Sequence, residues 1–154
     1  GRITHEDGRV FAKYTSRFGR RALDDLESLK DCPVTLQNFV EKKVELRATV
    51  VGTDIYTASI DVSRSNDSSK VDWRHYDWAN TEYRTYELPE DLRKKLLQLM
   101  RVLGLSYGAI DLVVTPRDEY VFLEINPTGQ FLWVEDLTDL PIKNSMAKLL
   151  ISLC

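Results

Sequence analysis

Two apolar runs that flank a short polar link, near the end of the chain, constrain the fold most. Residues 108–115 and 120–127 are dominated by β-branched and apolar side chains, which are typical of strands. The link between them, residues 116–119, reads Pro-Arg-Asp-Glu and is rich in turn formers. The sequence therefore predicts an antiparallel β-hairpin here.

The register of this hairpin would bring three polar side chains together. If the four link residues form the loop, Thr115 faces Tyr120, and counting back along the ladder places Asp111 directly opposite Glu124, with Asn126 on the same face. Two carboxylates opposed across a sheet repel each other unless a positive charge lies between them. Because all three side chains offer hard oxygen ligands, the pattern favours Mg²⁺ or Mn²⁺ arriving with nucleotide phosphates over zinc. The alternative is a solvated polar face.

Composition points to a single domain of moderate size. At 154 residues, 43% hydrophobic and a net charge of -3, the chain can bury one core and is not basic enough to favour a nucleic acid partner. It has neither an apolar stretch of membrane-spanning length nor a visible signal peptide, so we expect a cytoplasmic protein without membrane association. The cysteines, Cys32 and Cys154, are expected to be reduced and not catalytic.

The order of the expected elements is that of an α+β fold, an antiparallel sheet with flanking helices. Further strands are predicted over 9–15, 34–40, 44–51 and 55–62. Helices are predicted over 20–30, over 89–103 and from residue 142 onward. Residues 65–69, Ser-Asn-Asp-Ser-Ser, are expected to form a mobile loop, and the stretch with Trp133, Glu135 and Asp136 a second loop.

Five blocks of the sequence resemble a known family in their order and spacing. They are residues 32–37, 44–52, 71–74, 107–111 and 123–130, the last reading Leu-Glu-Ile-Asn-Pro-Thr-Gly-Gln. Together they are similar to the ATP-grasp enzymes, nearest to the microviridin-type (graspetide) peptide ligases, with ribosomal-protein S6 glutamate ligases as more distant relatives. The resemblance covers roughly residues 8–150 and implies the C-terminal ATP-grasp subdomain.

The resemblance implies an ATP-dependent carboxylate–amine or carboxylate–hydroxyl ligase that acts through an acyl-phosphate, in peptide macrocyclisation or another peptide modification. Its cofactors would be ATP and Mg²⁺ or Mn²⁺, with the metal on Asp111, Glu124 and Asn126. The protein's contribution would be mostly electrostatic, because metal ions and arginines offset the charge that repels a carboxylate nucleophile. No protein nucleophile is required.

The resemblance also assigns the nucleotide contacts. The adenine hinge, which reads the base through backbone groups, would be Gln37, Asn38, Phe39 and Val40. The carboxylate for the ribose hydroxyls would be Glu45, with Glu41 as its rival at this spacing. The alternative for the hinge is an ordinary core strand end.

Two arginines are the candidate catalytic residues. Arg47 follows Glu45 at period two, so both point to one face of a strand, and a guanidinium suits phosphate oxygens. Its alternative is a surface salt bridge with Glu45. Arg74 resembles the family arginine that steadies the transferred phosphoryl group or the acyl-phosphate, and its alternative is an exposed, idle loop arginine.

The chain also departs from the family pattern. It is expected to begin within the lid hairpin, so that residues 1–30 would be a lid remnant and residues 31–154 the nucleotide- and metal-binding part of a partial ATP-grasp domain. The N-terminal half of the enzyme would then be a missing partner, together with its phosphate-gripping lysines, for which Lys13 is misplaced. We therefore expect the chain to be inactive alone. Ala109 stands where D-alanine ligases carry arginine, which argues against that branch.

Other function classes stay open. A non-catalytic ATP-binding module would keep the hinge and the metal triad. A peptide-binding domain would use the aromatic residues of 61–86 as a recognition surface, unless they are buried; these are Trp73, Tyr76, Trp78, Tyr83 and Tyr86. Within the ligases, glutamate addition to a protein tail is the runner-up. The peptide or protein substrate, ester or amide product, and homodimer formation also stay open.

Overall fold

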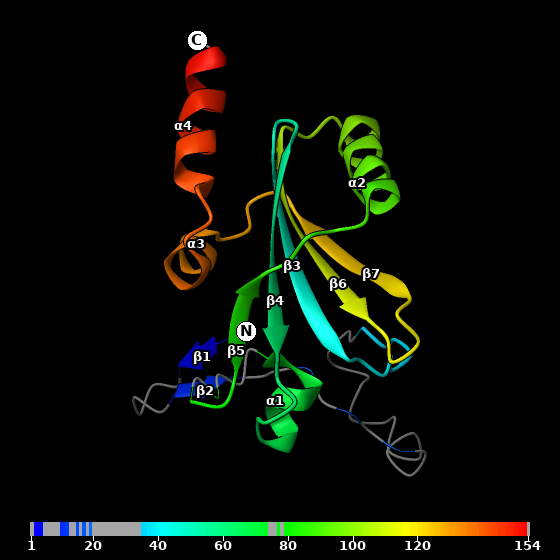
Figure 1. Cartoon of the computed structure of the whole chain (residues 1–154). Helices are drawn as coiled ribbons and strands as arrows, with labels where there is room; N and C mark the ends of the chain where they lie inside the picture. Colours follow the sequence, from blue (N-terminus) through cyan, green and yellow to red (C-terminus); the bar gives the residue numbers. More distant parts are fainter. Residues whose placement is uncertain are drawn as a thin grey trace.

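The computed structural model describes residues 2–4, 10–12, 15, 17, 19, 35–73, 77 and 79–153. Its main body is a five-stranded antiparallel sheet in the order β5-β4-β3-β6-β7 (Figure 1). These strands are β3 (Val44–Val51), β4 (Asp54–Asp61), β5 (Glu82–Thr85), β6 (Tyr107–Val114) and β7 (Tyr120–Asn126). A separate two-stranded sheet pairs β1 (Arg2–Thr4) with β2 (Val10–Ala12). The predicted α+β class with an antiparallel sheet is confirmed.

One face of the sheet packs against α2 (Glu90–Leu103). The side chains on this face form the larger core, in which Leu46, Val50 and Ile110 meet Leu96 and Met100 of the helix. Helix α2 ends where predicted, because Gly104 adopts the left-handed conformation (φ 65°) and its N–H caps carbonyls of the last turn.

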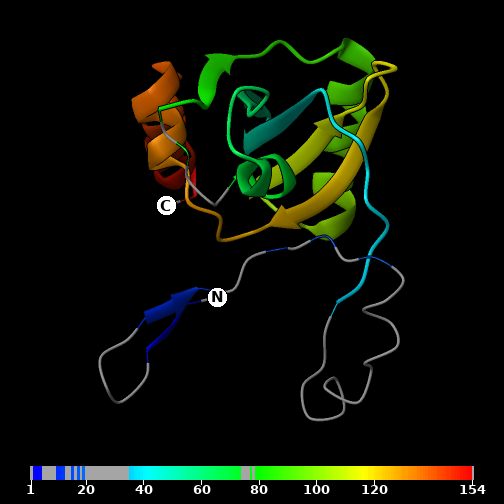
Figure 2. The ribbon, with the colours of Figure 1, turned by 90° about the horizontal axis from the view of Figure 1, so that it is seen from below.

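The opposite face is covered by α3 (Leu132–Thr138) and α4 (Ile142–Ser152), so the sheet lies between helices (Figure 2). Here Val51 and Ala58 pack against the fully buried Val134 and Ile142. The hydroxyl of Ser145 on α4 also bonds Tyr56 on β4 at 2.5 Å. This second face carries Glu45, Arg47, Asp111 and Glu124, because side chains alternate along each strand. None of the described helices is long and apolar enough to cross a membrane.

Two sequence predictions were wrong on this second side of the molecule. Residues 35–42 form no strand, because none of the described strands pairs with them, and they run along the surface with Leu36 and Phe39 exposed. The stretch around Trp133, predicted as a loop, is helix α3, whose Val134 reaches the core. This short helix is stabilised by tertiary packing, which local sequence patterns do not reveal.

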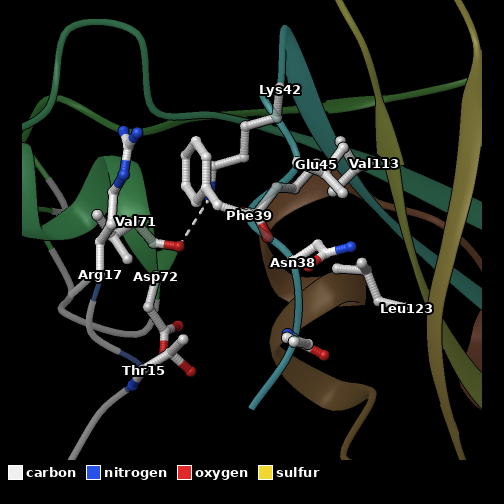
Figure 3. Close-up of a pocket in the computed structure, with 12 residues that line it drawn as sticks. Thr15, Arg17, Asn38, Phe39, Lys42, Glu45, Val71, Asp72, Val113 and Leu123 are labelled. Carbon is white, nitrogen blue, oxygen red and sulfur yellow. Dashed lines mark hydrogen bonds and ion pairs between the residues drawn. The ribbon is translucent and has the colours of Figure 1, made fainter. Parts of the chain in front are cut away.

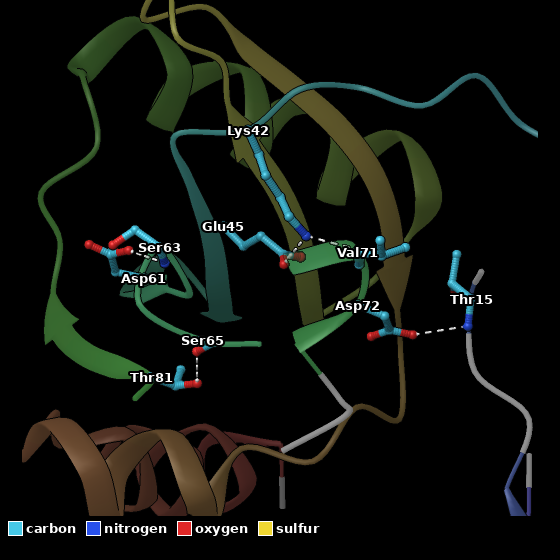
Figure 4. Close-up of polar contacts among 9 residues, drawn as sticks. All are labelled: Thr15, Lys42, Glu45, Asp61, Ser63, Ser65, Val71, Asp72 and Thr81. Carbon is cyan, nitrogen blue, oxygen red and sulfur yellow. Dashed lines mark hydrogen bonds and ion pairs between the residues drawn. The ribbon is translucent and has the colours of Figure 1, made fainter. Parts of the chain in front are cut away.

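The predicted mobile loop at 65–69 was also wrong, since it holds a short helix, α1 (Asp67–Val71). Side-chain hydrogen bonds order this segment. Asp77 accepts a bond from the Asn66 backbone N–H at 2.9 Å. The Ser65 hydroxyl bonds the Thr81 hydroxyl at 3.0 Å, as Figure 4 shows. The sequence pattern did not predict strand β5 either. The predicted helix at 20–30 and both cysteines lie outside the described residues.

Candidate functional site

The predicted pairing of Asp111 with Glu124 is confirmed, although the predicted loop was one residue too short. Tyr120 pairs with Val114 rather than Thr115, so the turn spans five residues. Thr115 orders that turn, because its hydroxyl accepts bonds from two backbone N–H groups of the loop at 3.2 Å. A bulge in β7 then adds one residue, Leu123, to that strand. This extra residue offsets the longer turn, so that Asp111 pairs with Glu124 as predicted.

Arg47 extends this pair into a row of three charges across the sheet. It pairs with Asp111 in the β3–β6 ladder, and its Nε lies 2.8 Å from Asp111 Oδ1. Both side chains are about nine-tenths buried, so the ion pair is only weakly screened by solvent. Arg47 therefore offsets part of the repulsion between Asp111 and Glu124. The alternative that Arg47 pairs with Glu45 was wrong, because Glu45 binds Lys42 instead.

Asn126, the third predicted metal ligand, lies in the same ladder opposite Ala109. Its side-chain oxygen accepts the Thr128 backbone N–H at 2.9 Å, which folds the chain back over the sheet. The turn continues to Gly129, which packs so closely on Ala109 that a Cβ at position 129 would lie 2.5 Å from the alanine Cβ. The orientation of Asn126 is thus set by the turn that follows β7.

Tyr107 supports that turn from the first strand of the hairpin. Its hydroxyl donates a hydrogen bond to the Gly129 carbonyl. Burial raises the pKa of this hydroxyl above its usual value, and the nearby charge of Arg47 partly opposes the shift. The hydroxyl therefore stays protonated and able to donate throughout the physiological range.

The oxygen donors of Asp111, Glu124 and Asn126 suit a hard divalent cation, but they do not form a complete cage. No group of three or more His, Cys, Asp and Glu side chains gathers among the described residues. A Mg²⁺ ion commonly uses one or two carboxylates and completes its shell with water and phosphate oxygens. This donor set therefore fits a cation that arrives with a nucleotide better than a permanently bound structural ion.

A cavity of about 410 Å³ lies beside this row of charges, on the same face of the sheet. The predicted hinge and ribose residues all line it, namely Gln37, Asn38, Phe39, Val40 and Glu45. Glu41, the rival to Glu45, is exposed and does not line the cavity. The structure thus brings together the predicted nucleotide residues, although the hinge is an extended surface segment rather than a strand.

Several residues that line the cavity were missed by the sequence reasoning. Figure 3 shows the cavity between Val113 and Leu123 on the sheet side and Val71 and Asp72 on the other. Lys42, Thr15 and Arg17 complete the lining, and the Arg17 guanidinium lies 4.5 Å from the centre of the Phe39 ring. Leu123 enters the lining through the bulge, which no alternation pattern signals.

The aromatic residues proposed as a peptide-recognition surface are largely used inside the molecule. Trp73 is buried, and its ring lies 5.0 Å from that of Trp133, against which Tyr83 also packs edge-on at 6.0 Å. Trp133 also lies 5.7 Å from the Arg47 guanidinium, a cation–π contact. This burial weakens the interpretation as a peptide-binding surface for the aromatics described. Tyr76, Trp78 and the candidate Arg74 lie outside the described residues.

Solved structures supply the comparison. No family model and no curated protein matches the chain. A RiPP-associated ATP-grasp ligase from Chryseobacterium gregarium, in complex with ADP and a leader and core peptide, matches the whole chain at 40% identity and a TM-score of 0.88. The macrocyclase MdnC from Microcystis aeruginosa MRC, bound with precursor peptide MdnA, matches the whole chain at 39% identity and a TM-score of 0.82. The macrocyclase MdnB of the same organism matches 88% of the chain at 29% identity, with a TM-score of 0.57.

The chain spans somewhat less than half the length of these enzymes: 46% of the Chryseobacterium gregarium ligase, 47% of MdnC and 45% of MdnB. The similarity therefore extends over the sheet, the cavity and the charged row, and not over the remainder of the larger proteins. Since the first two enzymes match it from end to end at 40% and 39% identity, the chain belongs to the ATP-grasp ligases, among the microviridin-type peptide ligases.

Proposed function

We propose that this chain is the nucleotide- and metal-binding part of an ATP-dependent peptide ligase. One observation carries the proposal: the cavity and the charged row lie on the same face of the sheet, in adjacent positions. Glu45 pairs with Val113, both of which line the cavity, and Arg47 pairs with Asp111 two residues further along. Two residues of a strand span about 7 Å. A nucleoside in the cavity would therefore direct its phosphates toward Arg47 and Asp111.

The cavity fits the adenosine of ATP. Residues 35–42 make no strand, so backbone N–H and C=O groups of Gln37, Asn38, Phe39 and Val40 are available to read the edge of a purine. Val113 and Leu123 offer an apolar wall for the flat base. Glu45 would accept hydrogen bonds from the ribose hydroxyls. The Chryseobacterium gregarium ligase, whose structure is a complex with ADP, supports this assignment.

The charged row fits the phosphates and their cation. Asp111, Glu124 and Asn126 would hold Mg²⁺, and the ion would supply positive charge that offsets the charge of the phosphates. Arg47 would contact the phosphates, because its guanidinium is held on one side by Asp111 and covered on the other by Trp133. A guanidinium fixed in this way loses little freedom on binding, so it can stabilise the charge that develops during phosphoryl transfer.

The reaction we propose is the two-step one of a carboxylate ligase. A peptide carboxylate attacks the γ-phosphate and releases ADP, and an amine or hydroxyl then displaces phosphate from the acyl-phosphate to form an amide or ester. The chain contributes charge and position, with Arg47 and, by resemblance, Arg74 as the catalytic residues. The macrocyclases MdnC and MdnB support peptide macrocyclisation as the reaction class. Because the reaction uses ATP, we also propose a cytoplasmic location.

The direct test is calorimetric titration of the chain with ATP and Mg²⁺, repeated on the double variant Asp111→Asn/Glu124→Gln. We expect the double variant to lose affinity by more than about tenfold, because contacts that involve a charge contribute about 1.5–3 kcal/mol each. The matched control is Asp91→Asn/Glu87→Gln, which removes two exposed carboxylates at the α2 end and should bind as the unchanged chain does.

Equal binding by the active-site double variant and the control would contradict the metal assignment. A folded chain that binds no nucleotide at all would contradict the nucleotide assignment for the residues present here. The same titration on a chain with the length of the relatives would then show whether the remaining half is indispensable.

A further inference from the structure

Lys42 has no role in the function proposed above, yet it lines the cavity. Its ammonium group contacts Glu45 Oε1 at 2.5 Å and the backbone carbonyl of Val71 at 3.1 Å (Figure 4). The Lys42 and Glu45 side chains are only 10% and 11% exposed. Lysine is rarely buried to this extent without a partner, so these contacts are what keep it there.

The three partners come from separate parts of the chain. Lys42 belongs to the surface segment that carries the hinge, Glu45 lies on the central strand β3, and Val71 is the last residue of α1. One side chain therefore joins the hinge, the sheet and the helix around the cavity. Loss of Lys42 would remove its hydrogen bond to the Val71 carbonyl, through which it links the end of α1 to the Glu45 carboxylate.

We propose that Lys42 is a positioning residue that holds the Glu45 carboxylate in place for the ribose hydroxyls of the nucleotide. A glutamate has three rotatable side-chain bonds, and an unrestrained one loses that freedom when it binds a ligand. The contact with Lys42 fixes the carboxylate before the nucleotide arrives. This inference rests on the proposed function, since it requires the cavity to take a nucleotide.

The distinguishing measurement is the ribose preference of the cavity. The probes are ATP and 2′,3′-dideoxy-ATP, each with Mg²⁺, titrated into the chain and into the variant Lys42→Met. If Lys42 acts through Glu45, the substitution weakens ATP binding by about tenfold, the value of one hydrogen bond to a charged group, and leaves dideoxy-ATP binding nearly unchanged. The ratio of the affinity for ATP to the affinity for dideoxy-ATP then falls toward one.

Lys43→Met is the matched control. Lys43 is adjacent in sequence, but its ammonium pairs with Asp118 at 2.7 Å in the exposed hairpin turn, and it does not line the cavity. This variant should keep the ribose preference of the unchanged chain. Lys42→Arg retains the positive charge and should recover part of the ribose preference. If Lys42→Met does not fold, Lys42→Arg is the variant whose ribose preference is compared with that of the unchanged chain.

The double variant Lys42→Met/Glu45→Gln separates positioning from general support of the cavity. If Lys42 acts only through Glu45, adding Lys42→Met to Glu45→Gln costs little further ATP affinity, so the two effects are not additive. Equal weakening of ATP and dideoxy-ATP by Lys42→Met would overturn the inference and leave the proposed nucleotide site intact. An unchanged chain that binds neither nucleotide would overturn both.

Discussion

Gly129 shows how a single hydrogen atom in place of a side chain shapes the metal-side end of the site. The turn 126–129 folds over β6 so closely that Gly129 is buried against Ala109. Small residues at both positions allow Asn126 to remain beside Asp111 and Glu124.

Gly129→Ala is expected to destabilise the fold by about 1–3 kcal/mol, because the new Cβ would lie 2.5 Å from the Ala109 Cβ and the turn must move. Urea unfolding, followed by circular dichroism, measures the change in free energy. Gly19→Ala is the control, since no atom lies within 4 Å of a Cβ built at that position. Ala109→Gly should restore part of the stability of Gly129→Ala; no recovery would argue against this contact.

At the scale of secondary-structure elements, the bulge in β7 lets one strand contribute both to the cavity lining and to the row of charged residues. A regular strand would point Leu123 and Glu124 to opposite faces, whereas the bulge lets Leu123 line the cavity while Glu124 still faces Asp111. The apolar wall for the base and the carboxylate for the metal thus come from consecutive residues. The extended hinge segment closes the other side of the same cavity.

Leu123→Ala is expected to weaken ATP binding by about tenfold with little effect on stability, because the side chain is 38% exposed in the structure and its burial would be completed by the base. Titration with ATP and Mg²⁺ measures the affinity. The matched control is Phe122→Ala, whose side chain is 46% exposed and outside the cavity lining, and which should bind ATP normally. Similar losses in both variants would point to a general disturbance of β7.

At the scale of the whole molecule, a bond between two tyrosines joins the two edges of the sheet. Tyr86 follows edge strand β5, Tyr120 begins the opposite edge strand β7, and their hydroxyls lie 2.7 Å apart. Both rings pack against the core beneath α2. Burial and this hydrogen bond raise the pKa of the Tyr120 hydroxyl to about 12.

The raised pKa predicts a loss of stability at alkaline pH. The folded chain retains the Tyr120 proton up to about pH 12, whereas the unfolded chain releases it near the ordinary value of about 10. The stabilising contribution is therefore complete below about pH 10 and is lost as the pH rises toward 12. Urea unfolding across this range, compared with Tyr120→Phe, measures it. An equal decline in both proteins would show that other groups are responsible.

How much the sequence could predict differs between neighbouring elements. The helix that ends at Gly104 and the strands 44–51 and 55–62 were predicted well, because their periodicity and capping residues act locally. Helix α3 and strand β5 were missed, since both are short and are stabilised by packing of Val134 and by pairing with β4. The pairing of Asp111 with Glu124 was predicted correctly from a loop one residue too short, which the bulge offset.

The sequence by itself determined the α+β class and, through its resemblance to the ATP-grasp enzymes, the set of nucleotide and metal candidates, because the blocks that carry the resemblance keep their residue types at fixed spacing along the chain. Tertiary structure alone decided which groups meet. It placed Glu45 rather than Glu41 at the cavity and formed the ion pair between Arg47 and Asp111. It also brought Lys42 into hydrogen-bonding contact with Val71, 29 positions away in the sequence. Such contacts depend on how strands and helices pack, and packing joins residues whose separation in sequence carries no local signal.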